Sequence, residues 1–542
     1  MTLKSTRVAL LAISFAFVLS ACGTPGPSSG QVASSIQSRI AALDRGAASV
    51  RGQRLWMRKA VTDFYQDRKA ERAWDGGDTE EILKAIRQID RDGLNPADYH
   101  LAAIEKLQKE REKATSPALE ADLDLLLTDA VAAMVDHTRY GRVRPVSLNP
   151  SWNVDPREGA PRLDREVAQI AQASSAGNAL ESAKPIHFIY QGLKRALAQL
   201  RETAAGGGWS AVPQGKPIRP GGIDRRIPSI RARLKATGEY GGGQSASTTY
   251  DSELQKAVEL FQARNRLDGN GIIDKDVINA MNVTVAARIG QVRSNMERAR
   301  WVLPGLGDEF LLVNLPAYKA YLIRGDKNIW EARTQIGEEG KETPSFRATM
   351  QTVVFNPDWT VPNSIISEEI APGMNQGKNY LAQKGLVVTD QSGNEVDPGS
   401  VDWGNAESGD FPYTLKQPPG PANALGKVKF LFPNPYSIYL HDTPSKGSFE
   451  SEKRTFSHGC IRLENPLELA EILLRGQDGW NTAKIQDVLA TDKTTNVELE
   501  KRLSVVIVYW TVTVGASGEI RYARDIYGLD PRVLAALDGR RM

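Results

Sequence analysis

The sequence predicts a multidomain α+β protein, with a helical scaffold, a small three-helix domain and a β-rich domain that carries a long insertion. The chain has 542 residues, too many for one hydrophobic core, which suggests two to four domains. Up to about residue 303 apolar residues recur every three or four positions, the helical period. From residue 310 they form short runs typical of strands. Glycine and proline dominate residues 203–222, which indicates a domain border.

Composition argues against nucleic acid as a partner. Apolar residues make up 41% and charged residues 25% of the chain, as in an ordinary soluble globular protein. The 68 basic and 65 acidic side chains leave a net charge of +3, and no block of like charge stands out. We therefore expect no nucleic-acid partner.

Residues 1–21 have the pattern of an export signal. Lys4 and Arg7 precede an apolar run, residues 8–19, that is too short to span a bilayer but has the length of a signal-peptide core. The following Leu19-Ser20-Ala21-Cys22 resembles the lipobox of bacterial lipoproteins, which implies a lipid on Cys22; the alternative is an ordinary cleaved signal. We expect a periplasmic protein held by this lipid, at the outer rather than the inner membrane because Gly23 follows the cysteine.

The next two regions are expected to be a flexible tether, residues 22–50, and a helical scaffold domain, residues 51–222. The tether is rich in Gly, Pro, Ser and Ala. Helical periodicity in the scaffold region is clear over residues 119–134. This region contains no catalytic cluster, and we interpret its isolated His100 and His137 as structural or exposed.

Residues 223–283 predict a compact three-helix unit with a small core of its own. Its apolar positions fall on three faces: Ile227, Ile230, Leu234; Leu254, Ala257, Val258, Phe261; Leu267, Ile272, Ile273, Ile278. The order of helix, Gly-rich loop, second helix and the Gly-rich segment 269–273 is similar to the peptidoglycan-binding domain of bacterial wall enzymes. That resemblance implies wall binding, but some such domains are only spacers, and both alternatives stay open.

A linker helix over residues 284–306 is expected to lead into a β-rich catalytic domain, residues 307–542. Residues 356–424 interrupt its strands with a helical stretch and a long polar segment, and we interpret this insertion as a lid. The expected strands are 310–315, 318–323, 329–336, 349–355, 427–432, 436–440 and 505–514.

One cysteine and two histidines lie close together in this last domain. Cys460 follows His458 and Gly459, and His441 ends an apolar run that predicts a buried strand. A thiol attacks carbonyl carbon as thiolate, and an imidazole can take its proton and later return it to a leaving amine. If Cys22 is lipidated or removed, Cys460 is the only free thiol; its alternative is an inert core cysteine. A helix expected from Pro466 would help to lower the pKa of Cys460.

These residues carry a resemblance to a known family. His441, fifteen intervening residues, and then Ser457-His458-Gly459-Cys460-Ile461-Arg462 resemble the signature of the L,D-transpeptidase (YkuD-type) catalytic domain. Residues 92–100, Asp-Gly-Leu-Asn-Pro-Ala-Asp-Tyr-His, are similar to the scaffold of its larger, YcbB-like members, which carry a capping subdomain where the lid is expected.

The resemblance implies a role for each residue of the motif. Cys460 would be the nucleophile and His441 its base, while His458 and Arg462 would bind or orient the donor peptide. Ser457 and Gly459 share the nucleophile's loop, where backbone amides can serve an oxyanion. Tyr439 would line the pocket or pack in the core. Arg462 would bind a substrate carboxylate or pair with Asp442 or Glu464.

The activity implied is the formation of 3-3 peptidoglycan cross-links through a thioester, without a cofactor. The partners implied are a tetrapeptide stem as donor, the amine of another stem's diamino acid as acceptor, and a carbapenem as inhibitor. An L,D-carboxypeptidase or an enzyme that attaches lipoproteins to the wall would use the same residues. Two alternatives from other classes are a zinc hydrolase, with His441, His458 and Cys460 as ligands, and a non-catalytic wall-binding lipoprotein.

Overall fold

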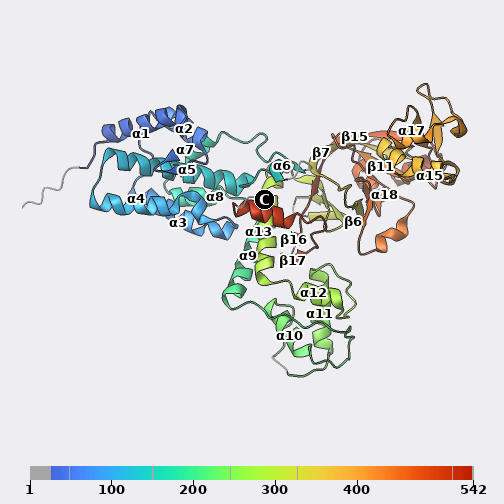
Figure 1. Ribbon diagram of the computed structural model, residues 1–542, viewed down its shortest axis with the longest axis horizontal. Coiled ribbons are helices and arrows are strands. Elements are labelled where there is room, and N and C mark those ends of the chain that lie inside the picture. The colour runs from blue at the N-terminus through green and yellow to red at the C-terminus, as the bar shows by residue number, and fades with distance from the viewer. Residues whose placement is uncertain are drawn as a thin grey trace, which may run out of the picture.

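The computed structural model describes residues 26–47, 49–148, 152–243, 246–325, 327–515 and 517–539. The expected signal peptide and Cys22 lie outside these residues. Figure 1 shows a helical scaffold on one side, the catalytic domain on the other, and a small helical domain that projects where the two meet. Within the described ranges no helix is long and apolar enough to cross a membrane.

The scaffold domain is built around α5 (Pro117–Tyr140), which is buried along almost its whole length. Because a helix buried on every side needs neighbours all round it, the other helices pack about α5. Its buried Asp129 accepts a hydrogen bond from Met57 N at 2.8 Å and contacts His100 Nε2 at 2.7 Å. The other scaffold helices are α1 (Ser29–Asp44), α2 (Arg58–Asp67), α3 (Gly76–Gln88), α4 (Leu101–Lys113), α6 (Pro145–Leu148), α7 (Leu163–Ala171), α8 (Ala176–Ser182) and α9 (Phe188–Ala205).

The flexible tether expected over residues 22–50 is wrong for most of its length, because residues 29–44 form α1. Ser28 caps this helix by accepting a hydrogen bond from Gln31 N, and the Gln31 side chain accepts one from Ser28 N in return. Composition pointed to a tether, but four apolar residues share one face of the helix and are buried against the scaffold: Val32, Ile36, Ile40 and Leu43.

The small domain has three helices, as the sequence predicts: α10 (Ile227–Ala236), α11 (Ser252–Arg264) and α12 (Lys275–Met281). Its hydrophobic core is separate from the one that the scaffold and the catalytic domain share. Next in the chain, α13 (Val285–Val302) contacts α9 of the scaffold and α20 (Asp530–Leu537) near the C-terminus. Helix α13 therefore lies where the three domains meet (Figure 1).

The catalytic domain is a sheet that closes on itself. Its strands follow the order β11-β12-β14-β6-β5-β4-β15-β7, and β7 also pairs with β11. Closure leaves no free edge in this ring. The scaffold's β3 (Trp152–Asn153) pairs in parallel with the first two residues of β7. The bounds are β4 Glu309–Asn314, β5 Lys319–Arg324, β6 Lys327–Gly337, β7 Ser345–Phe355, β11 Val428–Leu431, β12 Leu440–His441, β14 Ile461–Leu463 and β15 Thr495–Val508.

Two of the expected strands differ. Of residues 436–440 only Leu440 belongs to a strand, because the Asn434 side chain accepts hydrogen bonds from Tyr436 N (3.0 Å) and Ile438 N (3.1 Å) and holds a loop. The run 505–514 divides into the end of β15 and β16 (Val512–Val514), which forms a hairpin with β17 (Ile520–Tyr522).

The insertion that we call the lid, residues 356–424, has its own hydrophobic core. Three strands form its sheet, and short helical segments pack beside them. The strands are β8 (Trp359–Thr360), β9 (Val387–Thr389) and β10 (Thr414–Gln417), and the helical segments are α14 (Asn363–Ile365), η3 (Ile366–Ile370), α15 (Ala371–Asn375), α16 (Tyr380–Lys384) and α17 (Trp403–Glu407).

Candidate active site

Four side chains form a row across one face of the sheet. In strand register Lys429 of β11 lies opposite His441 of β12, His441 opposite Arg462 of β14, and Arg462 opposite Gln335 of β6. Directly opposed residues project from the same face of a sheet. The row therefore surrounds the buried imidazole of His441 with a lysine on one side and an arginine on the other.

Cys460 lies on the same face, one position before β14 and two before Arg462. Ile461 N donates to Tyr439 O at 3.1 Å, which continues the parallel pairing of β12 and β14 back to this point. Cys460 therefore lies diagonally across from His441, immediately before the neighbouring strand β14. The two side chains form no hydrogen bond, and the thiol instead donates to Ser437 O at 3.7 Å.

The imidazole of His441 is held in one orientation and is neutral at physiological pH. Its Nδ1 lies 2.5 Å from Asp442 O. A carbonyl only accepts, so Nδ1 carries the proton and Nε2 keeps a lone pair. Burial, and then the positive charges of Arg462 and Lys429, lower the pKa of His441 to about 3. The ring is therefore a base that is ready to accept a proton.

The thiol is also neutral in this state. Burial raises the pKa of Cys460, although interaction with Tyr439 and the positive charges of Lys429 and Arg462 partly oppose the rise. The expected help from a helix is weak: α18 (Pro466–Leu474) begins only after β14, so its N-terminus lies at the far end of that strand from Cys460. The described state thus holds a neutral thiol near a neutral imidazole.

The loop that carries Cys460 is fixed from within by Ser457. This buried hydroxyl donates to Cys460 O at 2.6 Å and accepts from Gly459 N at 3.2 Å. Ser457 therefore holds the loop, and its expected part in oxyanion or substrate binding stays a prediction. Gly459 has φ +113, which favours glycine. Because the Gly459 amide is already bonded, the amide of Cys460, which has no acceptor among the described residues, is the better oxyanion donor.

A second set of hydrogen bonds ties this loop to the rest of the molecule. Thr343 Oγ1 donates to Gly459 O at 2.7 Å and accepts from Gly337 N at 2.9 Å. Gly337 O accepts from Tyr527 Oη at 2.6 Å. Tyr527 belongs to the C-terminal segment, so that segment reaches the loop of Cys460 through two residues, Gly337 and Thr343.

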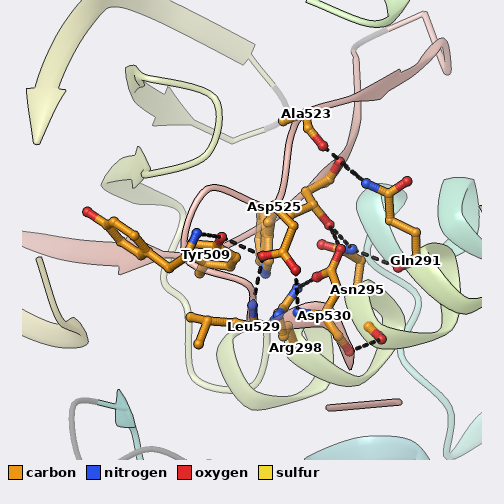
Figure 2. A network of polar contacts seen from close by, with 12 residues as sticks. Gln291, Asn295, Arg298, Tyr509, Ala523, Asp525, Leu529 and Asp530 are labelled. Atoms are coloured by element: carbon orange, nitrogen blue, oxygen red, sulfur yellow. Dashed lines mark hydrogen bonds and ion pairs between the residues drawn. The ribbon is translucent and has the colours of Figure 1, made fainter. Parts of the chain in front are cut away.

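Figure 2 shows how α13 holds the C-terminal segment. Asp525 accepts from Tyr509 Oη at 2.6 Å and from Leu529 N and Asp530 N, both at 2.8 Å. Asp530 in turn forms an ion pair with Arg298 of α13. The helix that follows the small domain is thereby connected to the active-site loop.

Comparison with known proteins agrees with this geometry. Residues 308–498 match the L,D-transpeptidase catalytic domain, residues 225–281 the "Putative peptidoglycan binding domain", and residues 59–197 the scaffold domain family. The chain carries an L,D-transpeptidase catalytic domain. A "Putative L,D-transpeptidase" of Haemophilus influenzae is 36% identical over 239 residues, 44% of this chain and 48% of that protein. The match thus spans about half the length of the relative.

A solved structure also matches, at a level that carries no argument. The L,D-transpeptidase of Xylanimonas cellulosilytica is 10% identical, with a TM-score of 0.17, over 55% of this chain and 99% of that one. The family and fold class expected from the sequence are confirmed by the domain matches, and the roles of the individual residues remain predictions.

Arg462 forms no ion pair with a carboxylate of the described residues, although the charge of Glu369 acts on it. Its Nη1 donates to Gln335 Oε1 at 3.2 Å. The two carboxylates considered as partners are taken, Asp442 by Lys446 at 2.5 Å and Glu464 by Arg333. This arrangement leaves Arg462 available for a substrate carboxylate.

The lid contacts the candidate site through two adjacent carboxylates on η3. Glu368 pairs with Lys341 at 2.8 Å, and Glu369 Oε1 lies 2.5 Å from His458 Nε2. A cavity of about 290 Å³ lies at this junction, lined by Glu368, His458 and Gly459 among others. His458, expected to orient the donor, therefore faces the lid. On the other side, Trp359 of the lid interacts with Tyr439, whose ring lies 5.5 Å from that of His441.

Three residues of the site carry no signal in the sequence. Lys429, Gln335 and Thr343 reach it from strands or loops distant along the chain, and only the strand order brings them together. The Lys429 ammonium lies 4.2 Å from the centre of the Tyr439 ring. Among the described residues, no three His, Cys, Asp or Glu side chains are arranged to hold a metal ion.

Proposed function

We propose that this protein is a cysteine-dependent L,D-transpeptidase that forms 3-3 cross-links in peptidoglycan. The observation that carries the proposal is the register of β12 and β14, which puts Cys460 and His441 on one face of neighbouring strands within a transpeptidase domain. The match of residues 225–281 to a peptidoglycan-binding domain supports peptidoglycan as the substrate.

In the first half-reaction a donor tetrapeptide acylates Cys460. The sulfur attacks the carbonyl between the third-position diamino acid and D-Ala while His441 Nε2 takes the thiol proton, and the Cys460 amide donates to the oxyanion. The tetrahedral intermediate collapses, the C–N bond breaks, and the imidazolium protonates the leaving amine of D-Ala. A thioester and a neutral imidazole remain.

In the second half-reaction the side-chain amine of another stem attacks the thioester. His441 takes a proton from the attacking nitrogen, the C–S bond breaks, and the proton returns to the sulfur. The product is a peptide bond between two third-position residues, and the free thiol is restored. Because the donor's leaving group departs before the acceptor reacts, the kinetics should be ping-pong.

The positive side chains of the site suit a donor that carries carboxylates. Arg462 forms no ion pair with a described residue, and the partly buried Lys429 forms none either. Burial lowers the pKa of both groups, so binding an anion would relieve the cost of keeping these charges out of water.

Defined muropeptides test the proposal. Incubation with a disaccharide tetrapeptide should yield a dimer whose mass is that of two donors less one D-Ala, and Cys460→Ser and Cys460→Ala should both abolish it. A carbapenem should add its full mass to Cys460 as the thiol opens the lactam. If a tripeptide appears and no dimer forms, the activity is that of a carboxypeptidase and not cross-linking. If neither a product nor a carbapenem adduct appears, catalysis is refuted.

We also propose export to the periplasm and a lipid on Cys22, as the lipobox-like Leu19-Ser20-Ala21-Cys22 suggests. Radiolabelled palmitate should be incorporated into the wild-type protein and not into Cys22→Ala. Separation of inner and outer membranes would then show which of them holds the anchor. Equal labelling of the two proteins would refute lipidation at this residue.

A further inference from the structure

The small domain, α9 of the scaffold and the β16–β17 hairpin enclose a cavity of about 700 Å³. It is distinct from the site of Cys460, since it has no lining residue in common with that site. Its volume is within the usual range for a small-molecule or short-peptide site. Walls of this cavity come from all three domains, and two of its residues are arginines that the fold buries: Arg233 of α10 and Arg288 of α13.

These two arginines differ from the other buried arginines of the described chain. Six arginines are buried, and four of them form ion pairs with carboxylates: Arg226 with Asp224, Arg231 with Asp251, Arg298 with Asp530 and Arg300 with Glu297. Arg233 and Arg288, 3% and 7% exposed, form none with a described residue. Burying a charge is costly unless it is paired. Both arginines face one cavity, where the charge of Glu239 acts on each of them but no carboxylate of the described residues forms an ion pair with either.

Neutral groups hold the two guanidinium groups in place. Arg233 donates to Met281 O at 2.6 Å and to Thr237 Oγ1 at 2.9 Å, and lies 4.0 Å over the Trp209 ring. Arg288 donates to Gln291 and Asn265 and lies 4.0 Å over the Tyr522 ring. A guanidinium has five N–H donors, so each retains three. Burial lowers the pKa of Arg233 to about 10; the charge of Glu239 opposes this effect and that of Arg288 adds to it.

Carboxylates also line the cavity, which indicates more than an anion as the occupant. Glu239 is paired with Arg264 at 2.8 Å and Glu519 with Arg521 at 3.0 Å. Glu202 of α9 forms no ion pair with a described residue and is available for a cation. A ligand that carries both a carboxylate and an amine satisfies both signs, whereas phosphate satisfies only one.

We propose that this cavity binds a short peptide with a free carboxylate and an amine, the chemistry of a peptidoglycan stem, with the carboxylate between Arg233 and Arg288 and the amine near Glu202. The identity of the peptide as a stem rests on the proposed function. The cavity would then bind a wall peptide at a place separate from Cys460, where the donor reacts. Helix α13, which lines the cavity with Arg288, also holds the C-terminal segment (Figure 2). Tyr527 of that segment bonds to Gly337, which reaches the loop of Cys460 through Thr343.

The test uses the full chain with Cys460 blocked by a carbapenem or iodoacetamide, so that binding at the catalytic cysteine is suppressed. A tetrapeptide stem is titrated by calorimetry. Saturable binding should remain in the blocked protein and weaken at least tenfold in Arg233→Met and in Arg288→Met. Lys256→Met, which removes a positive charge from the exposed side of α11, should bind as the wild type does.

Two further ligands identify what is recognised. A tetrapeptide with a C-terminal amide and inorganic phosphate should each bind at least tenfold more weakly than the acid. If phosphate binds as well as the peptide, the site is one for small anions and the proposal is wrong. It is equally wrong if no binding remains after blocking, or if both methionine variants bind normally.

Hydrogen exchange of the wild-type protein tests the proposal even if the methionine variants fail to fold. In the blocked wild-type protein the tetrapeptide should slow hydrogen exchange in residues 233–239 and 518–522, which line the cavity from two domains. Exchange that is unchanged there would overturn the proposal. Failure of the proposed function would be seen separately, as absence of the cross-linked dimer from unblocked protein.

Discussion

Thr343 Oγ1 donates a 2.7 Å hydrogen bond to the carbonyl oxygen of Gly459, the residue before Cys460. This bond fixes the peptide group whose N–H belongs to Cys460, because the carbonyl of Gly459 and the amide of Cys460 lie in one plane. Thr343 thereby orients the donor that we assign to the oxyanion, although its own buried side chain does not line the cavity beside His458.

Replacing Thr343 by valine should lower kcat about tenfold or more and change KM little. The substitution leaves the Gly459 carbonyl and the Gly337 amide without their partner, at about 1–3 kcal/mol for a buried group, and 1.4 kcal/mol corresponds to a tenfold change in rate. Thr343→Ser keeps the hydroxyl and should restore most of the rate. A valine variant that raises KM alone would show that the bond does not orient the loop.

The lid should open more readily when the contacts of Glu368 with Lys341 and of Glu369 with His458 are removed. Glu368 and Glu369 are about half exposed, so each contact contributes about 0–1 kcal/mol. The double variant Glu368→Ala/Glu369→Ala should therefore be alkylated at Cys460 by iodoacetamide up to about thirtyfold faster than the wild type, as measured by intact mass.

Ionic strength provides the control for this prediction. Salt screens exposed ion pairs, so alkylation of the wild type should accelerate with added salt and that of the double variant should not. Glu395→Ala, an exposed change elsewhere on the lid, should behave as the wild type. If the double variant reacts at the wild-type rate, other contacts hold the lid closed.

The order of domains and the residues of the motif could be predicted because their signals are local. The change from a helical period to short apolar runs marks the catalytic domain, and Cys460 and His441 each carry their context in adjacent residues. Lys429 and Thr343 could not be found in this way, because their place depends on which strands pair. Helix α1 could not be predicted for a different reason. The Gly, Pro and Ser residues before it indicate a tether, while the helical spacing of its four apolar residues is a weaker signal.

Arg462 should act on donor binding. Replacing Arg462 by methionine removes a charge-assisted hydrogen bond of about 1.5–3 kcal/mol, so KM for the tetrapeptide should rise roughly tenfold to a hundredfold. Arg462→Lys should recover part of this loss, since an ammonium keeps the charge but not the fork. Arg324→Met, at an exposed arginine that pairs with Glu309, serves as the control. An unchanged KM in Arg462→Met would place the carboxylate of the donor elsewhere.

Burial of neutral His441 should make the catalytic domain less stable in acid. The pKa is about 3 in the folded protein and 6.5 for an ordinary histidine, so between these values the unfolded chain binds a proton that the folded chain does not. The free energy of unfolding must therefore fall as the pH falls from 6.5 towards 3, by about 1.4 kcal/mol per pH unit. Above pH 6.5 both states are neutral and this effect disappears.

A comparison of variants isolates this effect from the other titrating groups. His441→Gln removes the effect, so its destabilisation relative to the wild type should be about 2 kcal/mol smaller at pH 5 than at pH 7. Tyr439→Phe changes a neighbour that does not titrate in this range, and its effect should be the same at both pH values. Urea unfolding followed by tryptophan fluorescence measures both. An equal effect of His441→Gln at pH 5 and pH 7 would mean that the folded imidazole titrates normally, and the low pKa on which its role as a neutral base depends would be wrong.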